Sequence, residues 1–178
     1  MKIAIISDTH DNFPAAVWII EYLNSHKIPV ALHAGDIINP GIIHRFIEHY
    51  TGHLHFVFGN NDGEKARLAL KAEAASNATC HHSDMHLELD GKKIFMNHYS
   101  TIGELVAHSG TVDVAIGGHD HKYRVIPHGK SLFINPGNTV MQDKWSTDTV
   151  EKTIGFVILD TNDLSHERVT IPATYNQE

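Results

Sequence analysis

The sequence predicts an α/β protein whose chain forms two β-sheets, and two observations carry this prediction. In residues 2–76, short apolar runs alternate with helical patterns in the order βαβαβα, which is typical of a parallel, doubly wound sheet. Residues 79–171 consist mainly of short β-branched runs with one short helical pattern between them. No internal repeat, low-complexity tract or linker separates the two parts, so we expect one domain over residues 1–178.

The first part of the chain is expected to hold three strand–helix units. Asn12 and Pro14 supply an N-cap and a proline in the first turn of the first helix. Asp62 is expected to cap the third helix, which is rich in Ala, Lys and Glu. The expected strands cover residues 2–7, 29–34 and 54–58, and the expected helices cover residues 15–23, 42–50 and 62–76.

The second part of the chain is expected to be rich in strands. Asp90-Gly91 separates two alternating runs and indicates a β-hairpin. Asn135-Pro136-Gly137 is a turn by composition. The expected strands cover residues 79–82, 85–89, 93–97, 112–116, 123–126, 131–134, 153–159 and 168–171, and a short helix is expected over residues 102–108.

Composition narrows the class of protein. Of the 178 residues, 42% are hydrophobic and 20% are charged, which is ordinary for a soluble globular protein. Cys80 is the single cysteine, so an intramolecular disulfide is excluded and a reducing compartment is favoured. The N-terminal apolar run is too short for a signal peptide, and no run reaches the roughly 18 residues that span a bilayer. We therefore expect a cytoplasmic protein with no membrane partner.

The formal net charge of −7 argues against a nucleic-acid surface built from Lys and Arg. The negative net charge does not exclude an anionic substrate, because bound metal ions can dominate the local electrostatic field. The chain has 16 histidines, of which His81 and His82 could hold an adventitious metal ion, although no nearby sequence completes a site.

Short clusters of metal-ligand residues follow five of the expected strands. One cluster alone would be weak evidence, since each could be a turn, a helix cap or a surface histidine. Strands that end side by side would bring all five clusters together. In chain order, the clusters are Asp8-Thr9-His10, Gly35-Asp36, Gly59-Asn60-Asn61-Asp62, His98 and Gly118-His119-Asp120-His121.

The ligand types in these clusters point to two metal ions. Two carboxylates, four imidazoles and one amide oxygen suit Mn²⁺, Fe²⁺, Zn²⁺ or Co²⁺ better than Ca²⁺ or a thiolate-bound metal. Seven ligands are too many for one such ion with an open position, and Asp36 is the natural bridge between two ions. Two divalent ions, two aspartates and a bridging hydroxide leave a charge of about +1, which would attract a phosphate. The expected chemistry is phosphoester hydrolysis.

The ordered set Asp8-x-His10, Gly35-Asp36, Gly59-Asn60-x-Asp62, His98 and Gly118-His119-x-His121 resembles the calcineurin-like metallophosphoesterases. Within them, the start Ser7-Asp-Thr-His-Asp-Asn12 and the small size resemble the bacterial and archaeal phosphodiesterases of the YfcE/MJ0936 type. The resemblance covers essentially the whole chain. It implies a four-layer α/β/β/α sandwich of two mixed sheets, with the metal site at the strand ends.

The resemblance also implies the ligand sets and the cofactors. One metal would be bound by Asp8, His10, Asp36 and His121. The other would be bound by Asp36, Asn60, His98 and His119. Asp36, Asn60 and His98 are the candidate catalytic residues, and the expected cofactors are two divalent ions, manganese first, with nickel, cobalt, zinc or iron as alternatives.

Two positions depart from the family pattern. The larger family usually has histidine where this chain has Asn61, and asparagine cannot act as a general acid. We hypothesise activity on aryl phosphodiesters, which have good leaving groups, and weak activity on alkyl monoesters. Tyr99-Ser100 stands where Gly-His is common, and Tyr99 either lines the mouth of the cleft or packs as an ordinary aromatic. Asp62 is expected to support its loop rather than to bind metal.

Other interpretations stay open at this stage. A non-catalytic scaffold that binds partner proteins is one, because a retromer subunit shares the implied fold; it predicts eroded metal ligands, and all seven are present. A dimetal hydrolase that cleaves amide bonds is the other. The expected partner is a small phosphoester substrate, nucleotide-like by family, and self-association into a homo-oligomer is open. Four further residues belong in the expected cleft without an assigned role: Asp11, Asn12, Asp120 and Asn138.

Overall fold

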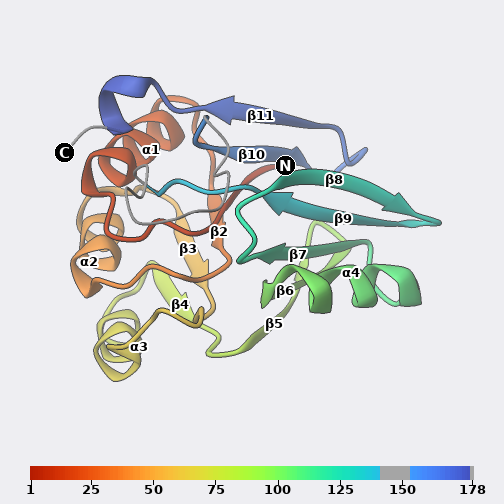
Figure 1. The fold of residues 1–178 in the computed structure, drawn as a ribbon, viewed down its shortest axis with the longest axis horizontal. Helices are drawn as coiled ribbons and strands as arrows, with labels where there is room; N and C mark the ends of the chain where they lie inside the picture. The colour runs from red at the N-terminus through yellow and green to blue at the C-terminus, as the bar shows by residue number, and fades with distance from the viewer. Residues whose placement is uncertain (141–152, 177–178) are drawn as a thin grey trace.

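The computed structural model describes residues 1–140 and 153–176, which form two mixed β-sheets flanked by helices (Figure 1). The first sheet has the strand order β11-β10-β1-β2-β3-β4, and the second has the order β5-β6-β7-β9-β8. The strands of the first sheet are β1 (Lys2–Ile6), β2 (Val30–His33), β3 (His53–Phe56), β4 (Ala78–Cys80), β10 (Gly155–Asp160) and β11 (His166–Thr170). Those of the second are β5 (Asp84–Leu89), β6 (Lys92–Tyr99), β7 (Val114–Gly118), β8 (Tyr123–His128) and β9 (Ser131–Pro136).

Three helices connect the parallel strands of the first sheet, and a fourth belongs to the second sheet. They are α1 (Phe13–Ser25), α2 (Pro40–His49), α3 (Lys65–Glu73) and α4 (Ser100–Ser109), and a 3₁₀ helix, η1 (Ala173–Asn176), follows β11. The order β1-β2-β3-β4 runs in one direction, so right-handed crossovers place α1, α2 and α3 on the same face. The expectation of a doubly wound sheet was therefore wrong, because the strand order among β1 to β4 never reverses.

Alternating side chains of β1 show what covers each face of the first sheet. Ala4 and Ile6 pack into a core with residues of α1, α2 and α3. Ile3 and Ile5 point the other way and pack with Met96, Ile116 and other residues of the second sheet. The outer face of the second sheet is covered by α4 through a smaller cluster. Figure 1 shows α1 to α3 on one side of the molecule and α4 on the other, which confirms the expected four-layer α/β/β/α sandwich of two mixed sheets.

Local sequence signals explain several element boundaries. The Asn12 side chain accepts a hydrogen bond from the backbone N–H of Ala15 at 3.1 Å, so the expected N-cap of α1 is confirmed. Asp90 and Gly91 both have positive φ, 55° and 73°, and form the expected hairpin turn between β5 and β6.

Two expectations about local structure were wrong. Asp62 does not cap α3, which begins at Lys65, because its carboxylate instead accepts backbone hydrogen bonds from Gly59 in its own loop and from Asp36 in the loop after β2. Asn135 and Pro136 are not in a turn but are the last residues of β9 and pair with β8, and Gly137, with φ of 83°, follows the strand. In the described part of the chain, no helix is long and apolar enough to cross a membrane.

Candidate metal centre

Loops from both sheets meet at one end of the sandwich and carry the expected ligands. The parallel strands β1, β2 and β3 end near Asp8, Asp36 and Asn60, so these residues come to the same edge of the first sheet. The backbone N–H of Asp8 donates to the carbonyl of Gly35 at 3.0 Å. The backbone N–H of His119, which follows β7, donates to Asp8 Oδ2 at 3.0 Å and ties the second sheet to the first.

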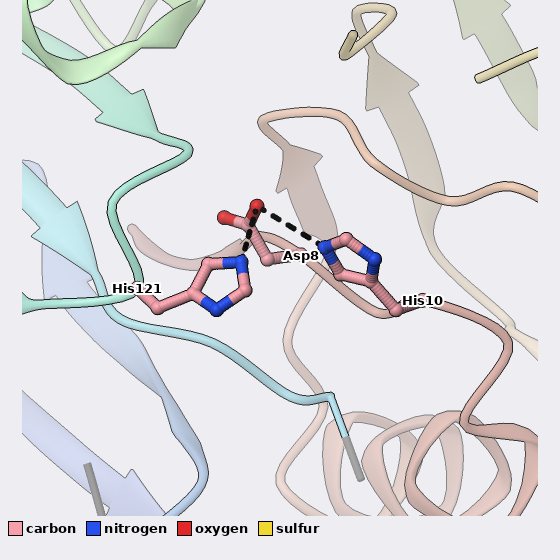
Figure 2. Close-up of side chains that lie close together, drawn as sticks. All are labelled: Asp8, His10 and His121. Carbon is pink, nitrogen blue, oxygen red and sulfur yellow. Dashed lines mark ion pairs between the residues drawn. The ribbon is translucent and has the colours of Figure 1, made fainter. Parts of the chain in front are cut away.

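Asp8, His10 and His121 form the first group of candidate ligands. One ligand atom from each lies within 4.8 Å of the other two. Asp8 Oδ1 is 3.3 Å from His121 Nε2 and 3.7 Å from His10 Nε2. Figure 2 shows the carboxylate between the two imidazole rings, which reach it from separate loops.

Asp36, His98 and His119 form the second group, again with ligand atoms within 4.8 Å of one another. Asp36 Oδ2 is 3.4 Å from His98 Nε2 and also 3.4 Å from His10 Nε2 of the first group. Asn60 Oδ1 is 2.9 Å from His98 Nε2. The structure therefore brings all seven expected residues together and places Asp36 between the two groups.

The centre has a buried floor and an open rim. Asp8, Asp36 and His98 are each at most 1% exposed, whereas Asn60 and His119 are exposed. Asp8 Oδ1 and His10 Nε2 are buried and have no hydrogen-bond partner among the described residues. Leaving such groups unsatisfied costs free energy, and a bound cation would satisfy both. The donor set thus fits divalent metal ions.

The electrostatics of the site keep its carboxylates ionised. Burial alone would raise the pKa of Asp8, but the imidazoles of His10 and His121 outweigh burial and hold that pKa well below its usual range. Burial opposes ionisation of Asp36 as well, and its contacts with His98 and Asn61 lower its pKa. A deprotonated carboxylate is the form that binds a metal ion.

The backbone of the candidate ligands adopts conformations that non-glycine residues rarely take. Five of the seven candidate ligands have positive φ, so the backbone of the loops that carry them is strained. Such strain persists only where surrounding contacts hold it, and it concentrates at functional sites. The five angles are 54° at Asp8, 42° at His10, 55° at Asp36, 72° at His119 and 60° at His121.

Two glycines in the motifs are required by close packing against the carboxylates. A Cβ on Gly59 would lie 2.0 Å from Asp36 Oδ1. A Cβ on Gly118 would lie 2.0 Å from Ser7 Oγ and 2.7 Å from Asp8 Oδ2. All three distances are far below van der Waals contact, so any side chain at either glycine would displace a candidate ligand.

Asp62 supports the loops that carry the candidate ligands Asp36 and Asn60, as expected from the sequence. Its carboxylate accepts backbone hydrogen bonds from Gly59 at 2.6 Å and Asp36 at 3.0 Å. It also accepts from Ile37 at 2.8 Å and Ile38 at 2.6 Å. One buried carboxylate therefore fixes the loops after β2 and β3 together.

Asp120 has a supporting role that sequence reasoning missed. Its carboxylate accepts hydrogen bonds from Ser100 Oγ at 2.9 Å and Asn135 Nδ2 at 2.8 Å, and it forms an ion pair with Arg124. These contacts hold the backbone between His119 and His121. In the sequence, the position of Asp120 between two candidate ligands, His119 and His121, is the one feature that points to this supporting role.

Asn61 and Tyr99, the two positions that depart from the family pattern, both lie beside the second group of candidate ligands. Asn61 donates from its backbone N–H to Asp36 Oδ1 and from Nδ2 to Asp36 Oδ2, each at 2.8 Å. Tyr99 is 40% exposed, and its ring centroid lies 4.9 Å from that of His119. This placement agrees with the interpretation that Tyr99 lines the mouth of the site.

Comparison with known proteins identifies the class that this fold and these motifs define. The chain belongs to the calcineurin-like phosphoesterase superfamily, whose domain model matches residues 1–164. It is 32% identical over 139 residues to phosphodiesterase MJ0936 of Methanocaldococcus jannaschii, covering 77% of this chain and 83% of that protein. The resemblance to the small YfcE/MJ0936-type branch is thereby confirmed.

Solved structures agree with this assignment. The structure of an archaeal phosphodiesterase superposes with a TM-score of 0.83 at 28% identity, covering 96% of this chain and all of that one. Vacuolar protein sorting 29 from Cryptosporidium parvum superposes with a TM-score of 0.68 at 17% identity, covering 96% of each chain. At that identity, the second likeness concerns the fold alone.

Proposed function

We propose that this protein is a metal-dependent phosphoesterase that hydrolyses phosphodiesters. The observation that carries the proposal is the position of Asp36, whose Oδ2 lies 3.4 Å from a histidine of each ligand group. A carboxylate shared in this way suits a bridge between two divalent ions. The likeness to phosphodiesterase MJ0936 supports a diester as the substrate.

The proposed ligands divide between two ions that share Asp36. Asp8, His10, Asp36 and His121 would hold one ion, and Asp36, Asn60, His98 and His119 would hold the other. Manganese is the first candidate for both positions, with nickel, cobalt, zinc or iron as alternatives, because the set mixes oxygen and imidazole ligands without a thiolate. When bound, two such ions supply a bridging hydroxide for in-line attack on phosphorus.

The chain's own residues prepare this site in the absence of substrate. His98 Nδ1 lies 2.8 Å from the carbonyl oxygen of Ala34, which can only accept, so the proton sits on Nδ1. That hydrogen bond fixes the ring and directs Nε2 toward Asp36 and Asn60. Asn60 and His119 form the exposed rim, where an incoming phosphoester would first meet the site.

The identity of residue 61 bears on the range of substrates. Asn61 offers no group that can protonate a departing alkoxide, and both of its hydrogen bonds go to Asp36. The proposed substrates are therefore small phosphodiesters with good leaving groups, such as aryl or nucleotide-like esters, rather than simple alkyl monoesters.

A metal-reconstitution panel tests the proposal. The protein is stripped of metal and reloaded separately with Mn²⁺, Ni²⁺, Co²⁺, Zn²⁺ and Mg²⁺, and hydrolysis of an aryl phosphodiester is measured. Activity should require metal and should be lost in Asp36→Asn, whereas Asp163→Asn, at an exposed loop position, should leave it unchanged. Hydrolysis that survives both metal removal and Asp36→Asn would overturn the proposal.

A non-catalytic binding protein is the second candidate, because vacuolar protein sorting 29 shares this fold. That candidate predicts that the metal-ligand positions have degenerated, yet all seven candidate ligands are present and lie together. Metal binding without hydrolysis of any phosphoester in the panel would favour it over the enzyme.

A further inference from the structure

A third group of metal-ligand residues lies outside the centre described above. Glu104 and His108 are one turn apart on α4, and His128 ends β8 at the edge of the second sheet. One ligand atom from each of the three side chains lies within 4.8 Å of the other two. Neither histidine belongs to a motif in the sequence, because α4 and β8 meet only in the folded chain.

The cluster is separate from the proposed dimetal site. β8 begins at Tyr123, two residues after His121, and His128 is its last residue. At about 3.3 Å per residue, the strand carries His128 roughly 17 Å away from that start. A ligand held by this cluster would therefore not belong to the dimetal centre.

The ligand atoms of the three side chains lie near one another, and one of them is a buried nitrogen without a partner. His128 Nε2 is 3.6 Å from Glu104 Oε1, beyond hydrogen-bond length, and it is buried without a hydrogen-bond partner among the described residues. The rings of His108 and His128 are in stacking contact, with centroids 3.8 Å apart and planes tilted by 40°, so the exposed His108 ring would have to turn away from His128 for both to bind one ion. Ligand atoms of a tetrahedral zinc ion with bonds near 2.0–2.1 Å stand about 3.3 Å apart, a spacing that His128 and Glu104 already approach and that rotation of the exposed His108 side chain would complete.

We propose that Glu104, His108 and His128 bind a zinc ion. Two imidazoles and one carboxylate form a ligand set that zinc accepts, with water in the fourth position. The Glu104 side chain is 36% exposed and His108 is exposed, so the ion can enter from solvent. The bound ion would hold α4 against the edge strand β8, whose backbone, within residues 1–140 and 153–176, pairs with β9 alone.

An ion pair between Glu104 and His128 is the simpler explanation of their proximity. It does not account for the approach of His108, which would add a second imidazole, and positive charge if protonated, beside the first. It also leaves His128 Nε2 too far from Glu104 for a hydrogen bond. A metal ion instead brings two neutral imidazoles and a carboxylate together.

Zinc titration of the full-length protein, followed by NMR of the histidine side chains, tests the proposal. The ring-nitrogen resonances of His108 and His128 should shift together and saturate as zinc is added. Equilibrium dialysis should show one zinc ion fewer per chain in the His108→Ala/His128→Ala variant. Glu104→Gln, a conservative change at a partly exposed position, should weaken binding at this site by about tenfold or more, since a direct ligand is lost.

His44→Ala supplies the matched control. His44 Nε2 lies 3.2 Å from Glu48 Oε1 on α2, also at i,i+4 spacing, but these two residues belong to none of the three ligand clusters in the described ranges. This variant should keep the wild-type zinc count. Unshifted His108 and His128 resonances, or an unchanged zinc count in the double variant, would overturn the proposal. Neither result depends on phosphoesterase activity, which the double variant should retain.

Discussion

The Asp62 carboxylate accepts the backbone N–H of Asp36 at 3.0 Å, so one aspartate positions the other, which is the proposed bridging ligand. Asp62 is 2% exposed and also accepts from Gly59, Ile37 and Ile38. Its loss would leave four backbone donors without their acceptor inside the protein. An unsatisfied buried donor costs about 1–3 kcal/mol, so the cost of removing this side chain is large.

We therefore expect Asp62→Ala to lower the free energy of unfolding by at least about 3 kcal/mol and to weaken metal binding. Urea denaturation and metal titration measure the two effects. Asp163→Ala is the control, because Asp163 is exposed and accepts a backbone hydrogen bond only within its own turn, from Ser165 at 2.9 Å. Equal stability of the two variants would show that Asp62 does not organise these loops.

The positions of the candidate ligands were predictable because they depend on a simple relationship. Asp8, Asp36 and Asn60 each follow a strand, and parallel strands necessarily end at the same edge of a sheet. The direction of winding was not predictable from the alternation of strands and helices. That alternation is the same whether the strand order reverses or not, so it did not reveal that α1, α2 and α3 share a face.

The role of Asp62 shows where local patterns fail. Its position before a helical segment favours a cap, which is a contact within a few residues. In the structure it accepts one local hydrogen bond, from Gly59, and three from residues 24 to 26 positions away, at Ile38, Ile37 and Asp36. Two partners of Asp120, Ser100 on α4 and Asn135 on β9, likewise lie 20 and 15 residues away, so no short sequence window contains them.

Asp120→Ala is expected to weaken metal binding without removing any proposed ligand. The side chain joins Ser100, Asn135 and Arg124, and its loss frees the loop that carries His119 and His121. Residues that orient metal ligands typically contribute 10–100-fold to affinity, so a loss of about tenfold is expected. Isothermal titration with Mn²⁺ measures it. An affinity equal to that of the wild type would exclude this supporting role.

Gly59→Ala and Gly63→Ala form a matched pair within one loop. A Cβ at Gly59 would collide with Asp36 Oδ1 at 2.0 Å, whereas a Cβ at Gly63 would meet nothing within 4 Å. We expect Gly59→Ala to abolish metal-dependent hydrolysis and Gly63→Ala to retain it. Metal content and activity are measured on both purified proteins. Full activity in Gly59→Ala would show that the Asp36 carboxylate need not lie against residue 59.

Burial of His55 predicts a pH dependence of stability. Burial, together with neighbouring His53 and His81, lowers the pKa of His55 from 6.5 to about 4. The unfolded chain therefore binds a proton at His55 in the range where the folded chain does not. The contribution of neutral, buried His55 to the free energy of unfolding is fully present above pH 6.5. It is lost as the pH falls from 6.5 toward 4.

A His55→Gln variant removes this titration. Between pH 6.5 and 4, the free energy of unfolding of this variant should fall less steeply with pH than that of the wild type. The difference in slope should correspond to about one proton taken up on unfolding. Urea denaturation across that range on metal-free protein gives both slopes. A wild-type slope in His55→Gln would mean that His55 titrates alike in both states.

Asn61→His tests the link between the missing acid and the choice of substrate. A histidine at position 61 would supply a proton donor beside Asp36, where Asn61 now donates two hydrogen bonds. General acid catalysis contributes about 10²–10⁴-fold and matters most when the leaving group is poor. We therefore expect Asn61→His to raise the rate on an alkyl phosphodiester while changing the rate on an aryl phosphodiester much less.

The aryl ester serves as the internal control, since any disturbance of the metal centre through lost hydrogen bonds to Asp36 would lower both rates together. The ratio of alkyl to aryl rates therefore isolates protonation of the leaving group from metal binding. Asn61→Ala removes the Nδ2 hydrogen bond without adding an acid, so its ratio should equal that of the wild type. If the ratio in Asn61→His also stays at the wild-type value, residue 61 does not explain the preference for good leaving groups.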